Sequence, residues 1–299
     1  MGFNVLSLFD GISCGQIALQ RAGIKVDKYY ASEIDKSAIK VTQANYPNTI
    51  QVGDVSKLDS KDFSDISLVC GGSPCQPFSF SGKQLAFADP RAKLFFEYVR
   101  ILKEVKPKYF FLENVRMKQE YQDIITEHMG VEPICINSRL VSSQNRVRYY
   151  WTNIPNVTQP EDKNITWQDI KEDGIEIESH PRDQECVAAM RGRYLVDGKR
   201  QDGKQLTKGL TQQYIEFRHD GKTNTITTVS KDNVVVPFKL EKRVLASEFD
   251  YRFMTPLEHE RLQTVDDGYT DHVGATKRCK LLGNAWTVDV ISHVFKGMK

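Results

Sequence analysis

The sequence predicts an α/β fold, a Rossmann-like sheet joined to a second, smaller and loop-rich β unit. Short apolar runs such as residues 4–8 and 66–70 alternate with helical patterns through the first half of the chain, which is typical of a largely parallel sheet. From residue 156 to about residue 250 the chain has many glycines and only short β-like runs, such as residues 225–229. A length of 299 residues favours two cores over one.

The first strand, residues 4–8, runs into a glycine-containing turn and then a short helix that ends at Gly23. Strand, glycine turn and helix open a nucleotide-binding βαβ unit. The turn lacks the G-x-G-x-x-G pattern, and Asp10 stands where a pyrophosphate needs neutral hydrogen-bond donors. A ligand with a cationic centre and no phosphate, such as S-adenosylmethionine, tolerates that carboxylate better. Alternatively, Gly11 and Gly15 only make a tight turn.

Two acidic residues follow the next strands. Glu33 ends the strand that starts at Lys28 and comes 22 positions after Gly11, the spacing at which a carboxylate accepts hydrogen bonds from ribose hydroxyls. Asp54 follows the strand at residues 49–52, where it could accept from an adenine amino group or form a turn. Asp35 is expected to be an N-cap for a helix over residues 36–45.

A constrained cysteine follows the strand at residues 66–70. The segment is Gly71-Gly72-Ser73-Pro74-Cys75-Gln76-Pro77, and its two prolines restrict the backbone on both sides of the thiol. Open α/β sheets place their ligands at the carboxyl ends of strands. Most buried cysteines are nevertheless inert, so Cys75 by itself predicts only a thiol held in one place.

Residues 91–105 have the spacing of an amphipathic helix, and the next apolar strand, residues 109–112, leads into Glu113. At the rim of a buried strand, desolvation favours the protonated acid, which could donate a proton; alternatively, Glu113 belongs to a solvated helix start. Arg146 and Arg148 lie two residues apart and therefore share one side of an extended chain. They could bind a base carbonyl, a phosphate or a carboxylate, or be surface charges.

Composition excludes several classes. The net charge of +2 is too small to indicate a nucleic-acid-binding protein by itself. Basic residues are nevertheless concentrated between residues 191 and 222, where aromatic and amide side chains lie among them. The six cysteines form no C-x-x-C pair, which argues against a structural zinc site and a disulfide framework. No apolar run is long enough to span a bilayer and the N-terminus has no signal-peptide pattern, so we expect a cytoplasmic protein without a metal.

Two helix starts are expected near the C-terminus. Thr255 is the expected N-cap of one helix, with Pro256 at its first position and Glu258 placed for a capping box. A last helix is expected to open at Gly283 and run to about Gly297.

Taken in order, these segments resemble the DNA (cytosine-5) methyltransferases. The resemblance rests on Phe9-Asp10-Gly11, Gly72-Ser73-Pro74-Cys75-Gln76-Pro77, Glu113-Asn114-Val115, Gln144-Asn145-Arg146-Val147-Arg148, Arg252-Phe253-Met254-Thr255-Pro256, Arg261-Leu262-Gln263 and Gly283-Asn284. Asn145 departs from the family's usual Gln-Arg-x-Arg, so Arg148 is the stronger candidate of the two arginines. The local sequence around Phe9 and Trp286 is similar to that of the vertebrate de novo methyltransferases, whereas the compact length of the chain is similar to that of bacterial and phage enzymes.

The resemblance implies a catalytic domain of residues 1–155 plus 281–299 that binds S-adenosylmethionine and releases S-adenosylhomocysteine. Residues 156–280 would form the target-recognition domain, with a hinge segment at residues 251–280. The implied catalytic residues are Cys75, Glu113, Arg148 and Arg146. The implied cofactor-binding residues are Phe9, Asp10, Gly11, Ile12, Glu33, Ile34, Asp54, Val55, Pro74, Asn284, Ala285 and Trp286.

The resemblance also implies the reaction, in which Cys75 adds to carbon 6 of a flipped cytosine in double-stranded DNA and carbon 5 is methylated. The expected protein is a monomer, with a cognate restriction endonuclease as a candidate partner. Three alternatives stay open. One is a transfer RNA cytosine-5 methyltransferase, although the Cys-Phe-Thr element of that branch is absent; another is a silent DNA-binding homologue. A nicotinamide oxidoreductase is disfavoured by Asp10. The DNA recognition sequence cannot be read from the chain.

Overall fold

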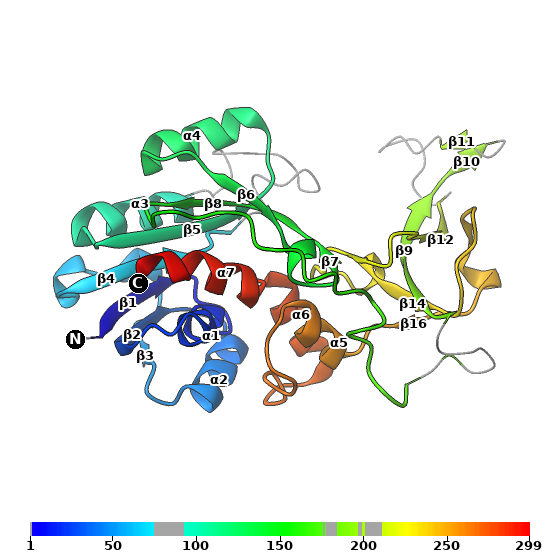
Figure 1. Cartoon of the computed structure of the whole chain (residues 1–299), viewed down its shortest axis with the longest axis horizontal. Helices are drawn as coiled ribbons and strands as arrows, with labels where there is room; N and C mark the ends of the chain where they lie inside the picture. The colour runs from blue at the N-terminus through cyan, green and yellow to red at the C-terminus, as the bar shows by residue number, and fades with distance from the viewer. Residues whose placement is uncertain (1, 75–92, 176, 178–183, 197–198, 201–210) are drawn as a thin grey trace.

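A seven-stranded mixed sheet forms the larger half of the computed structural model, which describes residues 2–74, 93–175, 177, 184–196, 199–200 and 211–299 (Figure 1). Its strand order is β3-β2-β1-β4-β5-β8-β6. The strands are β1 (Phe3–Leu8), β2 (Val26–Ser32), β3 (Ile50–Gln51), β4 (Ile66–Gly71), β5 (Tyr109–Val115), β6 (Ile134–Asn137) and β8 (Val147–Thr152). The predicted α/β sheet is confirmed.

Helices cover both faces of this sheet, as Figure 1 shows. One face packs against α1 (Cys14–Arg21), α2 (Lys36–Asn45) and α7 (Val288–Phe295), and the other against α3 (Lys93–Val105) and α4 (Gln119–Met129). Adjacent strand residues belong to opposite apolar clusters, as Leu68 and Val69 do, because successive side chains of a strand point to opposite faces. Burial on both faces explains why these strands read as continuous apolar runs.

Strands β1 to β5 of the sheet run parallel, whereas β8 is antiparallel to both β5 and β6. Because β8 runs in the opposite direction, its first residues lie beside the carboxyl end of β5, where Val115 pairs with Arg148. This reversal brings an arginine from the start of one strand to the edge at which the parallel strands end.

A second, antiparallel sheet lies at the other end of the molecule and has its own apolar cluster, which includes Met190 and Ile215 (Figure 1). Its order is β15-β12-β9-β14-β16. Its strands are β9 (Cys186–Arg193), β12 (Gln212–Phe217), β14 (Val234–Val236), β15 (Val244–Leu245) and β16 (Arg252–Phe253). The described residues also contain two short pairs, namely β10 (Leu195–Val196) with β11 (Lys199–Arg200) and β13 (Thr223–Asn224) with β7 (Gln144–Asn145).

The remaining elements are short. Helix α5 (Pro256–Leu262) begins with the predicted capping box, in which Thr255 and Glu258 bond reciprocally, and α6 (Ala275–Asn284) follows it. The 3-10 turns are η1 (Val55–Lys57), η2 (Ser60–Asp62), η5 (Ser138–Leu140), η7 (Ser230–Asp232), η8 (Ala246–Glu248) and η9 (Lys296–Met298). None of the helices within the described residues has the length and apolar character needed to cross a membrane.

Two expected elements are wrong. Residues 225–229 are not a strand, because their backbone bonds with side chains of other segments: Ile226 N donates to Gln144 Oε1, and Ile226 O accepts from Arg146 Nη1. The last helix does not open at Gly283, which belongs to the end of α6; α7 starts only at Val288. Residue 281, the expected domain boundary, therefore falls inside α6, and the division into domains stays a prediction.

Candidate active site

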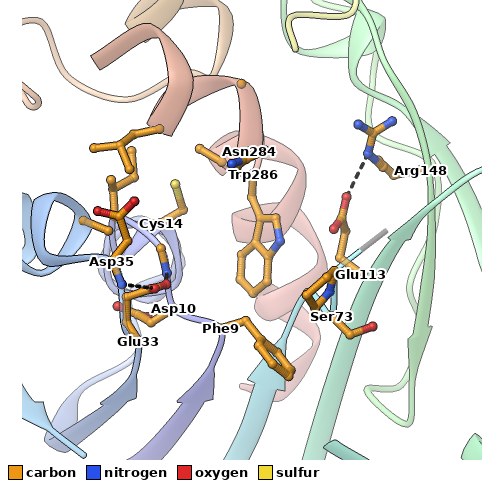
Figure 2. A pocket seen from close by; sticks show the side chains of 18 of the residues that line it. Phe9, Asp10, Cys14, Glu33, Asp35, Ser73, Glu113, Arg148, Asn284 and Trp286 are labelled. Carbon is orange, nitrogen blue, oxygen red and sulfur yellow. Dashed lines mark hydrogen bonds and ion pairs between the residues drawn. The ribbon is translucent and has the colours of Figure 1, made fainter. Parts of the chain in front are cut away.

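A cavity of about 250 Å³ lies at the edge where β1, β2, β4 and β5 end (Figure 2). The turn after β1 forms one wall, and the end of α6 with the following residues forms another. Nine of the residues expected to bind a cofactor line it, namely Phe9, Asp10, Gly11, Ile12, Glu33, Pro74, Asn284, Ala285 and Trp286. Glu113, Arg146 and Arg148 line the same cavity. Sequence positions up to 277 residues apart thus meet in one place.

The turn between β1 and α1 has an unusual backbone. Phe9 and Ser13 both have a φ of 58°, in the left-handed region that costs energy for residues with a side chain. Ser13 is the N-cap residue of α1, yet its hydroxyl makes no cap bond and instead donates to Asp10 Oδ2. Tyr29 Oη donates to the other oxygen, Asp10 Oδ1, at 2.7 Å. These contacts hold the Asp10 carboxylate in the cavity wall.

Glu33 fastens this turn to the end of β2. Its Oε2 accepts from Gly11 N at 2.8 Å, and its Oε1 accepts from the backbone N–H groups of Ile34 and Asp35 at 2.7 and 2.8 Å. A carboxylate has about four acceptor positions, so at least one is left for a ligand hydroxyl. Asp35 caps α2 through Ser37 N as expected, and its side chain also forms an ion pair with Lys277 of α6.

Glu113 and Arg148 form an ion pair across the β5–β8 boundary, with Glu113 Oε1 2.9 Å from Arg148 Nε (Figure 2). Only 12% of the Glu113 side chain and 13% of the Arg148 side chain are exposed. Of the partners expected for Arg148, the structure thus shows the carboxylate, which is that of Glu113. A nearly buried pair of opposite charges at a cavity wall can bind a polar planar group by several hydrogen bonds at once.

Trp286 stands in the cavity between the Glu33 side and the Glu113–Arg148 pair, as Figure 2 shows. Its indole packs edge-on against Phe111, with the ring centroids 5.3 Å apart. Gly72 allows this arrangement, because a Cβ there would lie 2.9 Å from Trp286 Nε1 and 3.1 Å from Glu113 Oε2. The glycine before the Ser-Pro-Cys segment is therefore needed for the close approach of Trp286 and Glu113.

The start of the cysteine segment is anchored from β5. Asn114, which is 1% exposed, donates from Nδ2 to Ser73 Oγ at 3.2 Å. Ser73 and Pro74 line the cavity. Cys75 itself lies outside the described residues, so its position stays a prediction. The anchoring role of Asn114 was missed, because an asparagine next to a candidate acid has no spacing signal of its own.

Arg146 has partners other than a catalytic carboxylate. It is 3% exposed and donates to two backbone carbonyls, Ile226 O at 3.0 Å and Ala285 O at 2.9 Å. It thereby ties the cavity wall to the segment that follows β13. Its expected contact with a base carbonyl stays a prediction, and Arg148 is the arginine that the structure pairs with Glu113.

Three predicted cofactor residues fall outside the cavity lining. Ile34 is 72% exposed, and Val55 is buried in the apolar cluster on the face of the sheet that α3 covers. Asp54 caps the η1 turn by accepting from the backbone N and the hydroxyl of Ser56. The turn-forming interpretation of Asp54 is thus confirmed; its contact with adenine, and cofactor binding by Ile34 and Val55, stay predictions.

Arginines of the expected recognition surface are paired within the second sheet and its loops. Arg193 bonds to Glu216 through two nitrogens, and Arg191 pairs with Asp232. Lys222 is buried, and its ammonium donates to Arg139 O and Ile165 O, so it joins the two halves of the chain. The charge pattern alone could not distinguish basic side chains with partners inside the protein from basic side chains that are available to bind a nucleic acid.

The cavity fits S-adenosylmethionine in the character of its walls. Glu33 offers an acceptor for ribose hydroxyls, Phe9 and Trp286 offer aromatic faces, and Asp10 offers negative charge without a phosphate-binding turn. Within the part of the chain that the structure describes, no group of three His, Cys, Asp or Glu side chains could hold a metal ion.

Comparisons with known proteins agree with this geometry. The family described as C-5 cytosine-specific DNA methylase matches residues 3–299. The type II methyltransferase M1.ScrFI of Lactococcus lactis subsp. cremoris is 29% identical over 99% of this chain and 78% of its own length. The orphan methyltransferase M.SPRI of Bacillus phage SPR is 33% identical over 75% of this chain and 54% of its own length.

The fold is shared with solved structures as well. The Entamoeba histolytica methyltransferase EhMeth superposes with a TM-score of 0.73 at 20% identity, over 100% of this chain and 99% of that one. The family match extends over nearly the whole sequence. Membership of this family therefore explains both the order of the motifs and the cavity in which they meet. The chain belongs to the C-5 cytosine-specific DNA methylase family and is a DNA (cytosine-5) methyltransferase by that membership.

Proposed function

We propose that this protein transfers a methyl group from S-adenosylmethionine to carbon 5 of a cytosine in double-stranded DNA, through a covalent bond between Cys75 and carbon 6. One observation carries the proposal. A single cavity joins the Glu113–Arg148 pair, the Ser73-Pro74 approach to Cys75, and the acidic turn formed by Asp10 and Glu33. A donor and a base could therefore meet there.

Covalent catalysis answers a chemical difficulty. Carbon 5 of cytosine is a poor nucleophile, and addition of the Cys75 thiolate to carbon 6 uses the carbon 5–carbon 6 double bond, removes the aromaticity of the ring and gives an enamine that can attack a methyl group. The bound donor supplies that methyl group on a sulfonium. After transfer, carbon 5 loses its proton to a base, the Cys75–carbon 6 bond breaks with its electron pair returning to sulfur, and 5-methylcytosine is released.

Glu113 and Arg148 would hold the base during these steps. Glu113 would contact ring nitrogen 3 and the exocyclic amine, and a proton shared at nitrogen 3 would balance the negative charge that develops as the thiolate adds. Arg148 Nη1 donates to Val147 O at 2.8 Å, and its Nη2 would donate to the base carbonyl. A cytosine inside a duplex hides these edges, so the base must be flipped out.

The partner and the setting are part of the same proposal. We infer a monomer that acts on duplex DNA, with the second sheet contributing to recognition; the cytoplasmic location stays a prediction. The relatives are described both as a type II methyltransferase and as an orphan methyltransferase, so both a paired endonuclease and a solitary enzyme are open.

Methyl transfer to defined nucleic acids tests the proposal. The purified protein would be incubated with S-adenosylmethionine carrying a labelled methyl group and with duplex DNA or transfer RNA, and nucleosides would be resolved by mass spectrometry. Labelled 5-methyldeoxycytidine from duplex DNA is expected, and base-resolved mapping would then give the recognition sequence. Label in transfer RNA alone would support the RNA alternative, and no label with bound donor and DNA would support a silent homologue.

A further inference from the structure

Among the described residues, four carboxylates line the cavity, and they differ in their partners. Glu113 pairs with Arg148, Asp35 pairs with Lys277, and Glu33 accepts three backbone N–H groups. Asp10 accepts only from neutral groups, among them the hydroxyls of Tyr29 and Ser13. Among the described residues, no Lys, Arg or His side chain forms an ion pair with Asp10. Asp10 and Glu33 are thus the two lining carboxylates without a cationic partner among the described residues, and Asp10 differs from Glu33 because hydroxyl groups, and not backbone N–H groups, hold it.

The surroundings of Asp10 decide when this charge is present. Burial, the largest effect, and the nearby Glu33 carboxylate raise the pKa of Asp10, while hydrogen bonds from Ser13, Ser7 and Tyr29 lower it; together they give a pKa of about 6. The other titratable groups that face it are Tyr29 from β2, Cys14 from α1, Cys70 from β4 and Tyr269. Burial raises the pKa of both thiols to about 12, so neither carries charge near neutral pH.

Methyl transfer changes the charge of the ligand. S-adenosylmethionine carries a sulfonium, whose sulfur keeps the bonding electron pair when the methyl group leaves and so becomes a neutral thioether in S-adenosylhomocysteine. The ammonium and carboxylate at the amino acid end are the same in both compounds. A carboxylate without a cationic partner inside the cavity would attract the donor more strongly than the product.

We infer that Asp10 is a specificity-determining residue that favours the cationic methyl donor over the neutral-sulfur product. Figure 2 places Asp10 beside Glu33, and Asp10 and Trp286 both line the cavity. The hydroxyls of Tyr29 and Ser13 hold the carboxylate there without neutralising it. Such a preference would limit inhibition by the product. The inference rests on the proposed donor and assigns a role within its site.

Direct binding separates this role from catalysis. Dissociation constants of S-adenosylmethionine and S-adenosylhomocysteine would be measured by calorimetry, without DNA, for the wild-type protein and for Asp10→Asn. We expect Asp10→Asn to weaken the donor about tenfold more than the product, as expected for loss of one charge interaction in a partly solvated site. Sinefungin, which carries an amine in place of the methylated sulfur, should follow the donor.

A matched control is available in the same cavity. Asp35→Asn also removes a carboxylate from the lining, but one whose charge is balanced by Lys277. It should change the two affinities by the same factor. If Asp10→Asn also changes both by the same factor, the inference is overturned. If the wild-type protein binds neither compound, the proposed donor fails instead, and the inference falls with it.

The wild-type protein gives a second test that needs no variant. The Asp10 carboxyl is ionised above pH 6 and gains a proton below it. The ratio of donor to product affinity should therefore be greatest near pH 8 and fall several-fold by pH 5, and donor binding near pH 6 should release protons. A ratio that is constant between pH 5 and pH 8 would contradict a charge-selecting Asp10 even if Asp10→Asn failed to fold.

Discussion

At the scale of single residues, the site depends on pairs that come from distant parts of the sequence. Glu113 and Arg148 are each an ordinary charged residue in the sequence, and a surface position was a reasonable interpretation of either. The antiparallel strand β8 places them 2.9 Å apart at a cavity wall, with little of either side chain exposed. Most surface ion pairs contribute little, so a nearly buried pair beside the Ser73-Pro74 approach is better explained by function.

Replacement of Glu113 by glutamine tests this pair. Glutamine keeps the size of the side chain but cannot share a proton at ring nitrogen 3, so the turnover number should fall by about 10²–10³-fold. Donor affinity should change by less than about threefold, because Glu33 and Asp10 lie on the other side of Trp286. Methyl-transfer kinetics and calorimetry measure the two quantities.

A matched control is Glu97→Gln on α3. Glu97 also pairs with an arginine, Arg100, but does not line the cavity. Its loss should leave turnover and donor affinity unchanged. Equal losses of turnover and donor affinity in Glu113→Gln would indicate that Glu113 only maintains the structure.

At the scale of elements, the end of α6 shows how local patterns succeed and fail. The helix at residues 36–45 could be predicted to the residue, because the Asp35 cap is a local signal that the structure confirms. The start of the last helix could not be predicted, because Gly283 is placed by a distant loop. A Cβ on Gly283 would lie 2.4 Å from the backbone carbonyl of Thr227. The glycine therefore lets the last turn of α6 pack closely against the segment after β13.

This close approach gives a stability prediction. Gly283→Ala forces the backbone of Thr227 away from α6, and the free energy of unfolding should fall by about 1–3 kcal/mol, as overpacking does elsewhere. Gly274→Ala, at the N-cap of the same helix, meets no atom within 4 Å and should change it by less than about 0.5 kcal/mol. Urea unfolding measures both, and similar values for the two variants would contradict the packing argument.

At the scale of the whole molecule, a buried network of amides joins the two halves of the chain. Gln144 and Gln263 are fully buried and bond to each other, and both bond to Thr287. Gln263 also donates to Leu282 O and Ala285 O, while Gln144 accepts from Ile226 N. The cavity wall at Ala285 is thus connected with the segment that leads into the second sheet.

The order of strands and helices from β1 to β5 could be predicted from apolar runs and caps, because these depend on neighbours in sequence, whereas α4 and the antiparallel direction of β8 were not predicted. The nine cavity residues could be named in advance from their motifs. The bonds of Gln144 and Gln263, the pairing of recognition arginines with Glu216 and Asp232, and the carbonyl contacts of Arg146 could not, because each depends on segments brought together by the fold.

Capture of a covalent complex tests the central claim most directly. Duplex DNA that contains 5-fluorocytosine at the mapped recognition site would be incubated with the protein and S-adenosylmethionine, and the products separated under denaturing conditions. Fluorine replaces the proton that must leave carbon 5, so elimination is blocked. We predict a denaturation-resistant adduct with the wild-type protein and none with Cys75→Ser. An adduct that persists in Cys75→Ser, or no adduct from a wild-type protein that methylates ordinary DNA, would contradict the assignment of Cys75 as the nucleophile.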